Sequence, residues 1–210
     1  QAQKALKIAI KTVGYLRTGL NFQSAGETVK IIRKMTDVTA VAITDHHKIL
    51  AYKGAGEDHH NVGKEELTSA TANAIKTGRY KVINNRVDIG CPVPDCPLHC
   101  GVIVPLKKKG ETVGTLKIYR GKGSRISQVD IELATGLAHL FSTQLELEEI
   151  QHQAQLLAGA EIKALQAQIN PHFLFNTLNT IVSFCRTDIE KARELLIHLG
   201  NFFRSTLKNS

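Results

Sequence analysis

The sequence predicts an α+β fold in which a mixed sheet with helices is followed by long helices. Apolar residues first follow a helical spacing, alternate as in strands between residues 38 and 119, and return to helical spacing from residue 128. Hydrophobic residues make up 42% of the 210 and charged residues 22%, a composition that excludes wholesale disorder. The 27 basic and 19 acidic residues give a formal net charge of +8, which permits contact with nucleic acid or acidic lipid without requiring it.

The first 125 residues carry the strand patterns. Glycines end the helical stretches, and Asp45-His-His-Lys48 separates two apolar runs as the turn of a hairpin. A second hairpin has the basic sequence Lys107-Lys-Lys-Gly-Glu111 at its tip, which we expect to be exposed. The predicted helices cover 4–18, 26–35 and 65–77, and the predicted strands cover 38–44, 49–53, 80–83, 101–106 and 112–119. About five strands with the helices on one face supply enough surface for a hydrophobic core.

A second regime begins near residue 126. From Gln128 to Asn170 proline is absent and apolar residues recur at steps of mostly three and four, which predicts one long helix. Such a helix must bury its apolar stripe, and we expect the same helix of a second chain as its partner in a homodimer. The alternative is that the helix folds back on the sheet domain. Two further helices are expected, to Arg186 and over 189–207, with Asp188 as the N-cap of the second.

The most informative segment is Gln168-Ile-Asn-Pro-His-Phe-Leu-Phe-Asn176. Pro171 bends the helical pattern directly before His172, and Asn176 follows His172 by four residues, so both side chains share one helix face. A neutral imidazole is a good nucleophile near pH 7 and suits phosphoryl transfer. The alternative role for His172 is that of a core histidine with a hydrogen-bond partner.

This segment closely resembles the phosphoacceptor box of the LytS-type sensor histidine kinases. Residues 193–207 resemble the second bundle helix of that family, and the upstream half is similar to the GAF sensor domain that its members carry. The resemblance implies a GAF-like sensor domain at 1–125 and a signalling helix or coiled coil at 126–170. Residues 171–210 would be the dimerisation and histidine phosphotransfer helices, forming half of a four-helix bundle and an incomplete kinase core.

The resemblance also implies a reaction. His172 would accept the γ-phosphoryl of ATP and pass it to an aspartate of a LytTR-type response regulator, with Asn176 in support. Nothing after Asn201 resembles an ATP-binding domain, so ATP and Mg²⁺ would be bound by the full-length kinase, in cis or in trans, and this chain is not expected to act alone. Phe173 stands where common histidine kinases place an acid, which leaves the general base open.

The resemblance places the full-length protein at the cytoplasmic face of the cell membrane, attached to a receptor domain in the inner membrane. No apolar run in this chain approaches the ~18 residues of a membrane span, and no basic recognition helix is present. We therefore expect a soluble piece of a longer protein that does not bind nucleic acid directly.

Three cysteines form the pattern C-x4-C-x3-C as Cys91, Cys96 and Cys100, with His99 beside the last. Three thiolates and one imidazole can hold Zn²⁺, and thiolates can hold an iron–sulfur cluster. A reversible thiol switch and a loop with incidental thiols are the alternatives. His59 and His60 are expected to be solvated, and Cys185 to be a small core residue. The rival function is a non-enzymatic, dimeric GAF module that senses a ligand or a metal.

Overall fold

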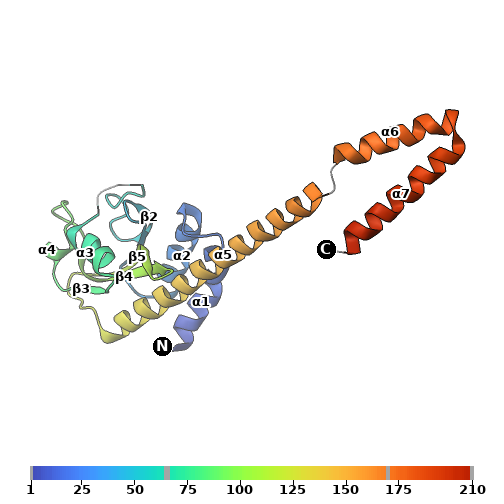
Figure 1. Cartoon of the computed structure of the whole chain (residues 1–210). Helices are drawn as coiled ribbons and strands as arrows, with labels where there is room; N and C mark the ends of the chain where they lie inside the picture. The colour runs from blue at the N-terminus through green and yellow to red at the C-terminus, as the bar shows by residue number, and fades with distance from the viewer. Residues whose placement is uncertain (1, 64–66, 169–170, 209–210) are drawn as a thin grey trace. The chain divides into compact units, whose positions relative to one another are not determined.

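The computed structural model describes residues 2–63, 67–168 and 171–208 (Figure 1). The chain divides into two compact units, residues 1–152 and residues 153–210. In chain order the elements are α1 (Ala2–Leu16), α2 (Phe22–Met35), β1 (Ala40–Thr44), β2 (Ile49–Gly54), α3 (Ser69–Thr77), β3 (Lys81–Ile83), α4 (Arg86–Ile89), β4 (Leu98–Lys108), β5 (Glu111–Gly121), α5 (Gln128–Gln168), α6 (Pro171–Thr187) and α7 (Ile189–Lys208).

The first unit is built on a five-stranded antiparallel sheet with the strand order β2-β1-β5-β4-β3. The two long strands, β4 and β5, form a hairpin in which Lys108 pairs with Glu111. Its turn residues Lys109 and Gly110 have φ values of +54° and +82°, as the tight hairpin turn requires at both positions. The predicted second hairpin is therefore confirmed, with strands that run closer to the tip than the sequence pattern suggested.

Hydrophobic cores lie on both faces of this sheet. On β5, Leu116 and Ile118 point to one face, which is covered by α1, α2 and the first part of α5. Tyr119 belongs to the opposite core, where α3, α4 and the loop before β4 pack. The expectation that all helices lie on one face is wrong, because α3 and the short α4, which was not predicted, bury Ala70, Ala74 and Ile89 against the other face.

The start of α5 is fixed to the sheet by charge. Asp130 is 3% exposed and accepts hydrogen bonds from Arg120 at 2.7 Å and from the Ser127 amide at 3.0 Å. Arg120 also pairs with Asp37 at 3.2 Å, so one guanidinium joins β5, α5 and the segment after α2. Burial opposes the charge of Asp130, but the hydrogen bonds outweigh it and lower the pKa of the carboxyl.

The first part of α5 shares the core of the sheet unit. Ala134, Leu137, Ala138, Phe141 and Leu145 are buried. The alternative to a helix that packs only on a second chain, in which the long helix packs on the sheet domain, is therefore correct for the first part of α5. Later apolar residues of the helix are exposed, among them Leu147, Ile150, Leu156, Leu157 and Ile162. Residues 169–170, the end of the predicted helix, lie outside the described residues.

Local capping explains where the helices begin. Asn21 Oδ1 accepts from the amides of Gln23 and Ser24, so α2 starts at Phe22, earlier than predicted. Asp188 accepts from the amide of Lys191 at 3.1 Å, which confirms its role as the N-cap of α7. Helix α3 starts at Ser69, later than predicted, and residues 64–66 of that prediction are outside the described residues. None of the described helices combines the length and the apolar character needed to cross a bilayer.

Candidate functional site

His172 lies in the first turn of α6 and is exposed. Pro171 is the first residue of this helix, a position where its missing amide hydrogen costs nothing. One helical turn later, Asn176 places its side-chain Nδ2 3.0 Å from Nδ1 of His172. The structure thus brings the two residues of the predicted box together on the exposed face of one helix.

This contact determines what the His172 ring can do chemically. A neutral imidazole carries one N–H and one lone pair, and the Asn176 amide offers either a donor or an acceptor to Nδ1. When the NH₂ group donates to Nδ1, the ring proton is on Nε2. When the amide turns its carbonyl oxygen toward an Nδ1–H, the lone pair is on Nε2. Within the described residues the His172 ring makes no second hydrogen bond, and the residue is exposed.

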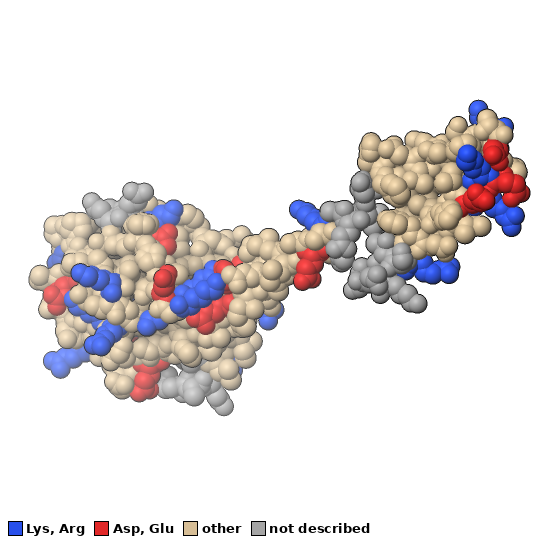
Figure 2. All heavy atoms as spheres, viewed as in Figure 1, with Lys and Arg blue, Asp and Glu red and all other residues tan. Residues whose placement is uncertain are grey.

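The α6–α7 pair leaves most of its apolar side chains uncovered. Phe173 packs against Phe202 across the pair with a ring distance of 5.5 Å, and among the described side chains of residues 153–204 only Ile181 and Ala192 are buried. Figure 2 shows that charged side chains of this unit gather near the α6–α7 connection, while much of the visible remainder is uncharged. Large exposed apolar residues are Phe175, Leu178, Val182, Ile189, Leu196 and Ile197.

Cys185 does not have the expected core position. It is exposed on α6, because a pair of helices by itself covers few side chains. The prediction of a buried structural cysteine is wrong for the chain as the structure describes it.

A second candidate site is a pocket of about 330 Å³ on the sheet face opposite α5. Its lining includes His59 and His60 from the loop after β2, and Cys91 from the loop after α4. The donor atoms of these three residues and of Cys96 all lie within 4.8 Å of one another. The histidine pair is half-buried rather than solvated, which corrects the expectation for His59 and His60.

The remaining residues of the predicted cysteine set lie elsewhere. Cys100 donates to the backbone oxygen of Ser124 at 3.4 Å, next to the start of α5, and burial raises the pKa of its thiol. His99 lines a different cavity with Arg86, Cys96 and Lys122, and it is not a member of the donor group at the sheet pocket. The register of β4 shifts between Leu98, which belongs to the core on the pocket side, and Cys100, which lines a separate cavity with Arg125 and Ile126. The set Cys91, Cys96, Cys100 and His99 is therefore corrected: only its first two members come together.

The pocket also holds a buried lysine. Lys117 on β5 is 4% exposed, and burial lowers the pKa of its ammonium to about 7. Burial likewise raises the pKa of the Tyr52 and Tyr119 phenols and of the Cys96 thiol. These shifts show that the pocket disfavours uncompensated charge.

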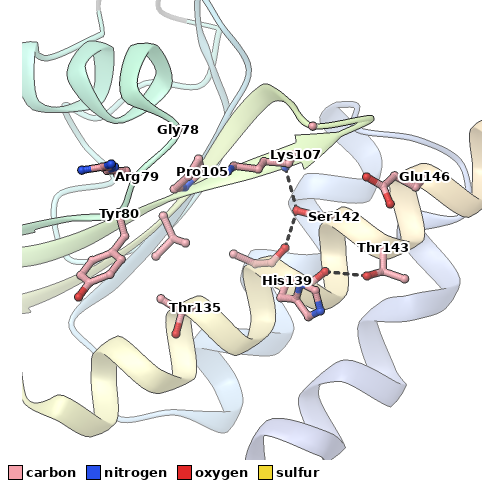
Figure 3. Close-up of a pocket in the computed structure, with 13 residues that line it drawn as sticks. Gly78, Arg79, Tyr80, Pro105, Lys107, Thr135, His139, Ser142, Thr143 and Glu146 are labelled. Carbon is pink, nitrogen blue, oxygen red and sulfur yellow. Dashed lines mark hydrogen bonds between the residues drawn. The ribbon is translucent and has the colours of Figure 1, made fainter.

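A wider cleft of about 580 Å³ lies between β4, α5 and the turn after α3 (Figure 3). The amide of Lys107 donates to Ser142 Oγ at 2.8 Å across it. Beyond the cleft the hairpin tip is tied to α5, since Lys108 pairs with Glu149 at 2.7 Å and the Lys109 amide donates to Glu146 at 3.1 Å. The tip is exposed at Lys109 and Gly110, as predicted, and its lysines also form ion pairs with the helix.

Comparison with known proteins agrees with this architecture. The family model described as Histidine kinase matches residues 160–210, and the one described as GAF domain matches residues 25–146, more than half of the chain. The chain belongs to the GAF domain family. The A. aeolicus nlh2 GAF domain in an inactive state has a TM-score of 0.54 at 16% identity, covering 70% of this chain and 98% of that chain. The predicted GAF-like α+β fold is thus confirmed.

The GAF domain and the helices that follow it resemble LytS proteins together. The chain is 49% identical over 210 residues to Sensor protein LytS of Bacillus subtilis (strain 168), of which it covers 35%. It is 44% identical over 210 residues to Sensor histidine kinase/phosphatase LytS of Staphylococcus aureus (strain Mu50), of which it covers 36%. The predicted resemblance to the LytS-type sensor histidine kinases is confirmed, and the chain spans about a third of the length of these relatives.

Proposed function

We propose that this chain is the sensor and phosphoacceptor portion of a two-component sensor histidine kinase, and that His172 is the phosphoacceptor. The observation that carries the proposal is the exposed His172 on α6, whose Nδ1 contacts Asn176 and whose Nε2 has no hydrogen-bond partner among the described residues. The names of the relatives, sensor protein and sensor histidine kinase/phosphatase, support the same role.

The reaction at His172 can be written from its two ring nitrogens. The Nε2 lone pair attacks the γ-phosphorus of ATP, the bond from that phosphorus to the bridging oxygen breaks, and ADP leaves. For this step the Asn176 amide turns its carbonyl oxygen toward Nδ1, where the structure places Nδ2. The proton then stays on Nδ1, and the oxygen accepts its hydrogen bond and stabilises the positive charge that develops on the ring. ATP and Mg²⁺ would be held by the catalytic domain of the full-length kinase. In the second step the phosphoryl passes from Nε2 to an aspartate of a response regulator, which we expect to be of the LytTR class.

Phe173 has no part in proton transfer. Its ring packs on Phe202, and an aromatic hydrocarbon cannot accept a proton. Asn176 orients the ring, as the acid after the histidine does in common histidine kinases. Unlike a carboxylate, a neutral amide accepts the hydrogen bond from Nδ1 without removing the proton. We therefore infer that the ring keeps its Nδ1 proton throughout the transfer.

A homodimer is part of the proposal. The α6–α7 pair and the later part of α5 expose many large apolar residues, whereas a monomeric protein usually exposes such residues singly. A second copy of the chain is the partner that covers them. Two pairs would form a four-helix bundle with His172 on its flank. The full-length protein would lie at the cytoplasmic face of the membrane, behind a receptor domain in the inner membrane.

Phosphate transfer in trans tests the proposal. The chain is mixed with the separately prepared ATP-binding domain of a LytS-type kinase, Mg²⁺ and γ-labelled ATP. We expect an acid-labile, base-stable label that His172→Gln abolishes and that His198→Gln, an exposed histidine of α7, retains. A label that survives His172→Gln, or one that His198→Gln removes, would overturn the assignment.

The rival function, a non-enzymatic GAF module that senses a ligand or metal, is favoured by one observation only, the group of histidines and cysteines at the sheet pocket. The two functions are compatible, because that group and His172 belong to different units of the chain.

A further inference from the structure

We infer that His59, His60, Cys91 and Cys96 form a tetrahedral Zn²⁺ site at the pocket on the sheet face. Their donor atoms lie within 4.8 Å of one another. In a tetrahedral zinc site with bonds of about 2.0–2.3 Å the ligand atoms are roughly 3.3–3.8 Å apart. The donor atoms that lie farthest apart therefore need to close by about 1.0–1.5 Å to bind the ion.

His59 already has the hydrogen-bonding arrangement of a metal ligand. Its Nδ1 lies 3.0 Å from Asp58 Oδ1, and this contact lowers the pKa of the Asp58 carboxyl. Its Nε2 is buried and has no hydrogen-bond partner among the residues that the structure describes. Metal-bound histidines commonly donate one N–H to a carboxylate and bind the ion through the other nitrogen. A buried nitrogen without a partner is otherwise costly, and an ion would satisfy it.

His60 is held beside the thiols by the local fold. Its Nε2 lies 3.4 Å from Cys96 Sγ, and its ring stacks on Tyr52 at 4.9 Å. Gly56 makes this arrangement accessible, since it has φ of +90° and a Cβ there would lie 3.0 Å from the His60 ring. The loop is therefore shaped to bring two adjacent imidazoles over the pocket.

The charges also balance. Zn²⁺ binding releases the two thiol protons, and one Zn²⁺ with two thiolates and two neutral imidazoles has no net charge. A neutral site suits a pocket in which burial disfavours uncompensated charge. Cysteine and histidine donors select zinc over Mg²⁺ and Ca²⁺, which prefer oxygen. The compact donor group fits a single ion, whereas a two-iron cluster needs its ligand pairs on opposite sides of a larger core.

The site joins two loops that are distant in sequence, the one after β2 and the one before β4. Bound metal would hold both loops against the sheet and fix the mouth of the pocket in which Lys117 and Tyr119 lie. No part of this inference depends on His172.

Metal titration of the 210-residue chain tests it. The reduced protein, freed of metal with a chelator, is titrated with Zn²⁺ and separately with Co²⁺ as a spectroscopic probe. We expect one ion per chain, thiolate-to-cobalt charge-transfer bands and the intense visible bands of tetrahedral cobalt. Cys91→Ser and His59→Gln should remove these signals. Asp58→Asn, which removes the carboxylate that contacts His59 Nδ1, should weaken the affinity for Zn²⁺ by about 10- to 100-fold.

The matched controls are Cys100→Ser, His99→Gln and Cys185→Ser, which alter the other cysteines and the neighbouring histidine and should leave binding unchanged. Circular dichroism identifies any variant that fails to fold. If Cys91→Ser or His59→Gln does so, Asp58→Asn still tests the site, because this exposed side chain can be changed without disturbing the core. Binding of less than one ion, absence of the thiolate bands, or an equal loss in Cys100→Ser would overturn the inference. Phosphate transfer to His172 would be unaffected by that failure.

Discussion

Asn176 Nδ2 lies 3.0 Å from Nδ1 of His172, one turn along the same face of α6. The amide is the one group among the described residues that fixes which ring nitrogen carries the proton. If Asn176 orients the ring, Asn176→Ala should slow phosphate transfer to His172 by roughly 10- to 100-fold without abolishing it. Nitrogen chemical shifts of the ring should show a change in tautomer populations. Asn179→Ala, an exposed change on the same helix, should affect neither quantity, and an equal effect of both variants would contradict the role of Asn176.

The exposed apolar residues of the second unit predict a dimer. Val182 is 61% exposed on α6, and Val182→Lys should lower the mass in sedimentation equilibrium from twice 23.1 kDa toward that of one chain. A charge placed in a buried helix contact has no partner and costs several kcal/mol, on the order of 2–4. Val87→Lys, at an 87% exposed position of α4, is the control and should leave the mass unchanged. A monomeric wild-type chain at micromolar concentration would refute the prediction.

The Arg120–Asp130 pair predicts a dependence of stability on pH. The folded state lowers the pKa of Asp130, so the pair contributes stability above the unfolded pKa and loses it as pH falls through the folded pKa. Asp130→Asn should cost about 1–3 kcal/mol at pH 7. The difference between the variant and the wild type should shrink toward pH 3 in thermal unfolding. Asp95→Asn, an exposed change, should show neither the cost nor the pH dependence.

Lys117 predicts a second rise of stability with pH, in a higher pH window. Burial lowers its pKa from 10.5 to about 7, so the unfolded state binds the extra proton between these values and stability rises with pH across that window. Lys117→Met should remove this rise and stabilise the metal-free chain at pH 7 by about 1–3 kcal/mol. Lys81→Met, on the exposed side of β3, should leave the rise intact. A pH profile that the Lys117 variant does not flatten would show that the buried ammonium is already compensated.

Local patterns predicted the strands, both hairpins and the α6–α7 pair. The alternation around Leu116 and Ile118 and the cap at Asp188 are properties of neighbouring residues, which a sequence displays directly. The box at His172 was equally accessible, because its residue types are specific and consecutive in the sequence.

The grouping of His59 and His60 with Cys91 could not be found in this way. The two segments are joined only by the fold of the sheet, with α3, β3 and α4 between them in the chain. The spacing of the cysteines pointed to Cys100 instead, and the register shift in β4 just before Cys100 has no signature in residue spacing. The sequence also did not show that only the first part of α5 packs on the sheet. The spacing of its apolar residues is the same whether they pack against a sheet or against another helix.

The attachment of the β4–β5 tip to α5 makes the helix responsive to ionic strength. The contacts of Lys108 and Lys109 with Glu149 are surface ion pairs, and mobile salt shortens the range of such attraction from about 8 Å at 0.15 M to about 3 Å at 1 M. The apolar contacts of Phe141 with the sheet do not weaken in the same way. A rise in ionic strength would thus weaken the attachment of α5 near Glu149 more than the attachment of its first turns.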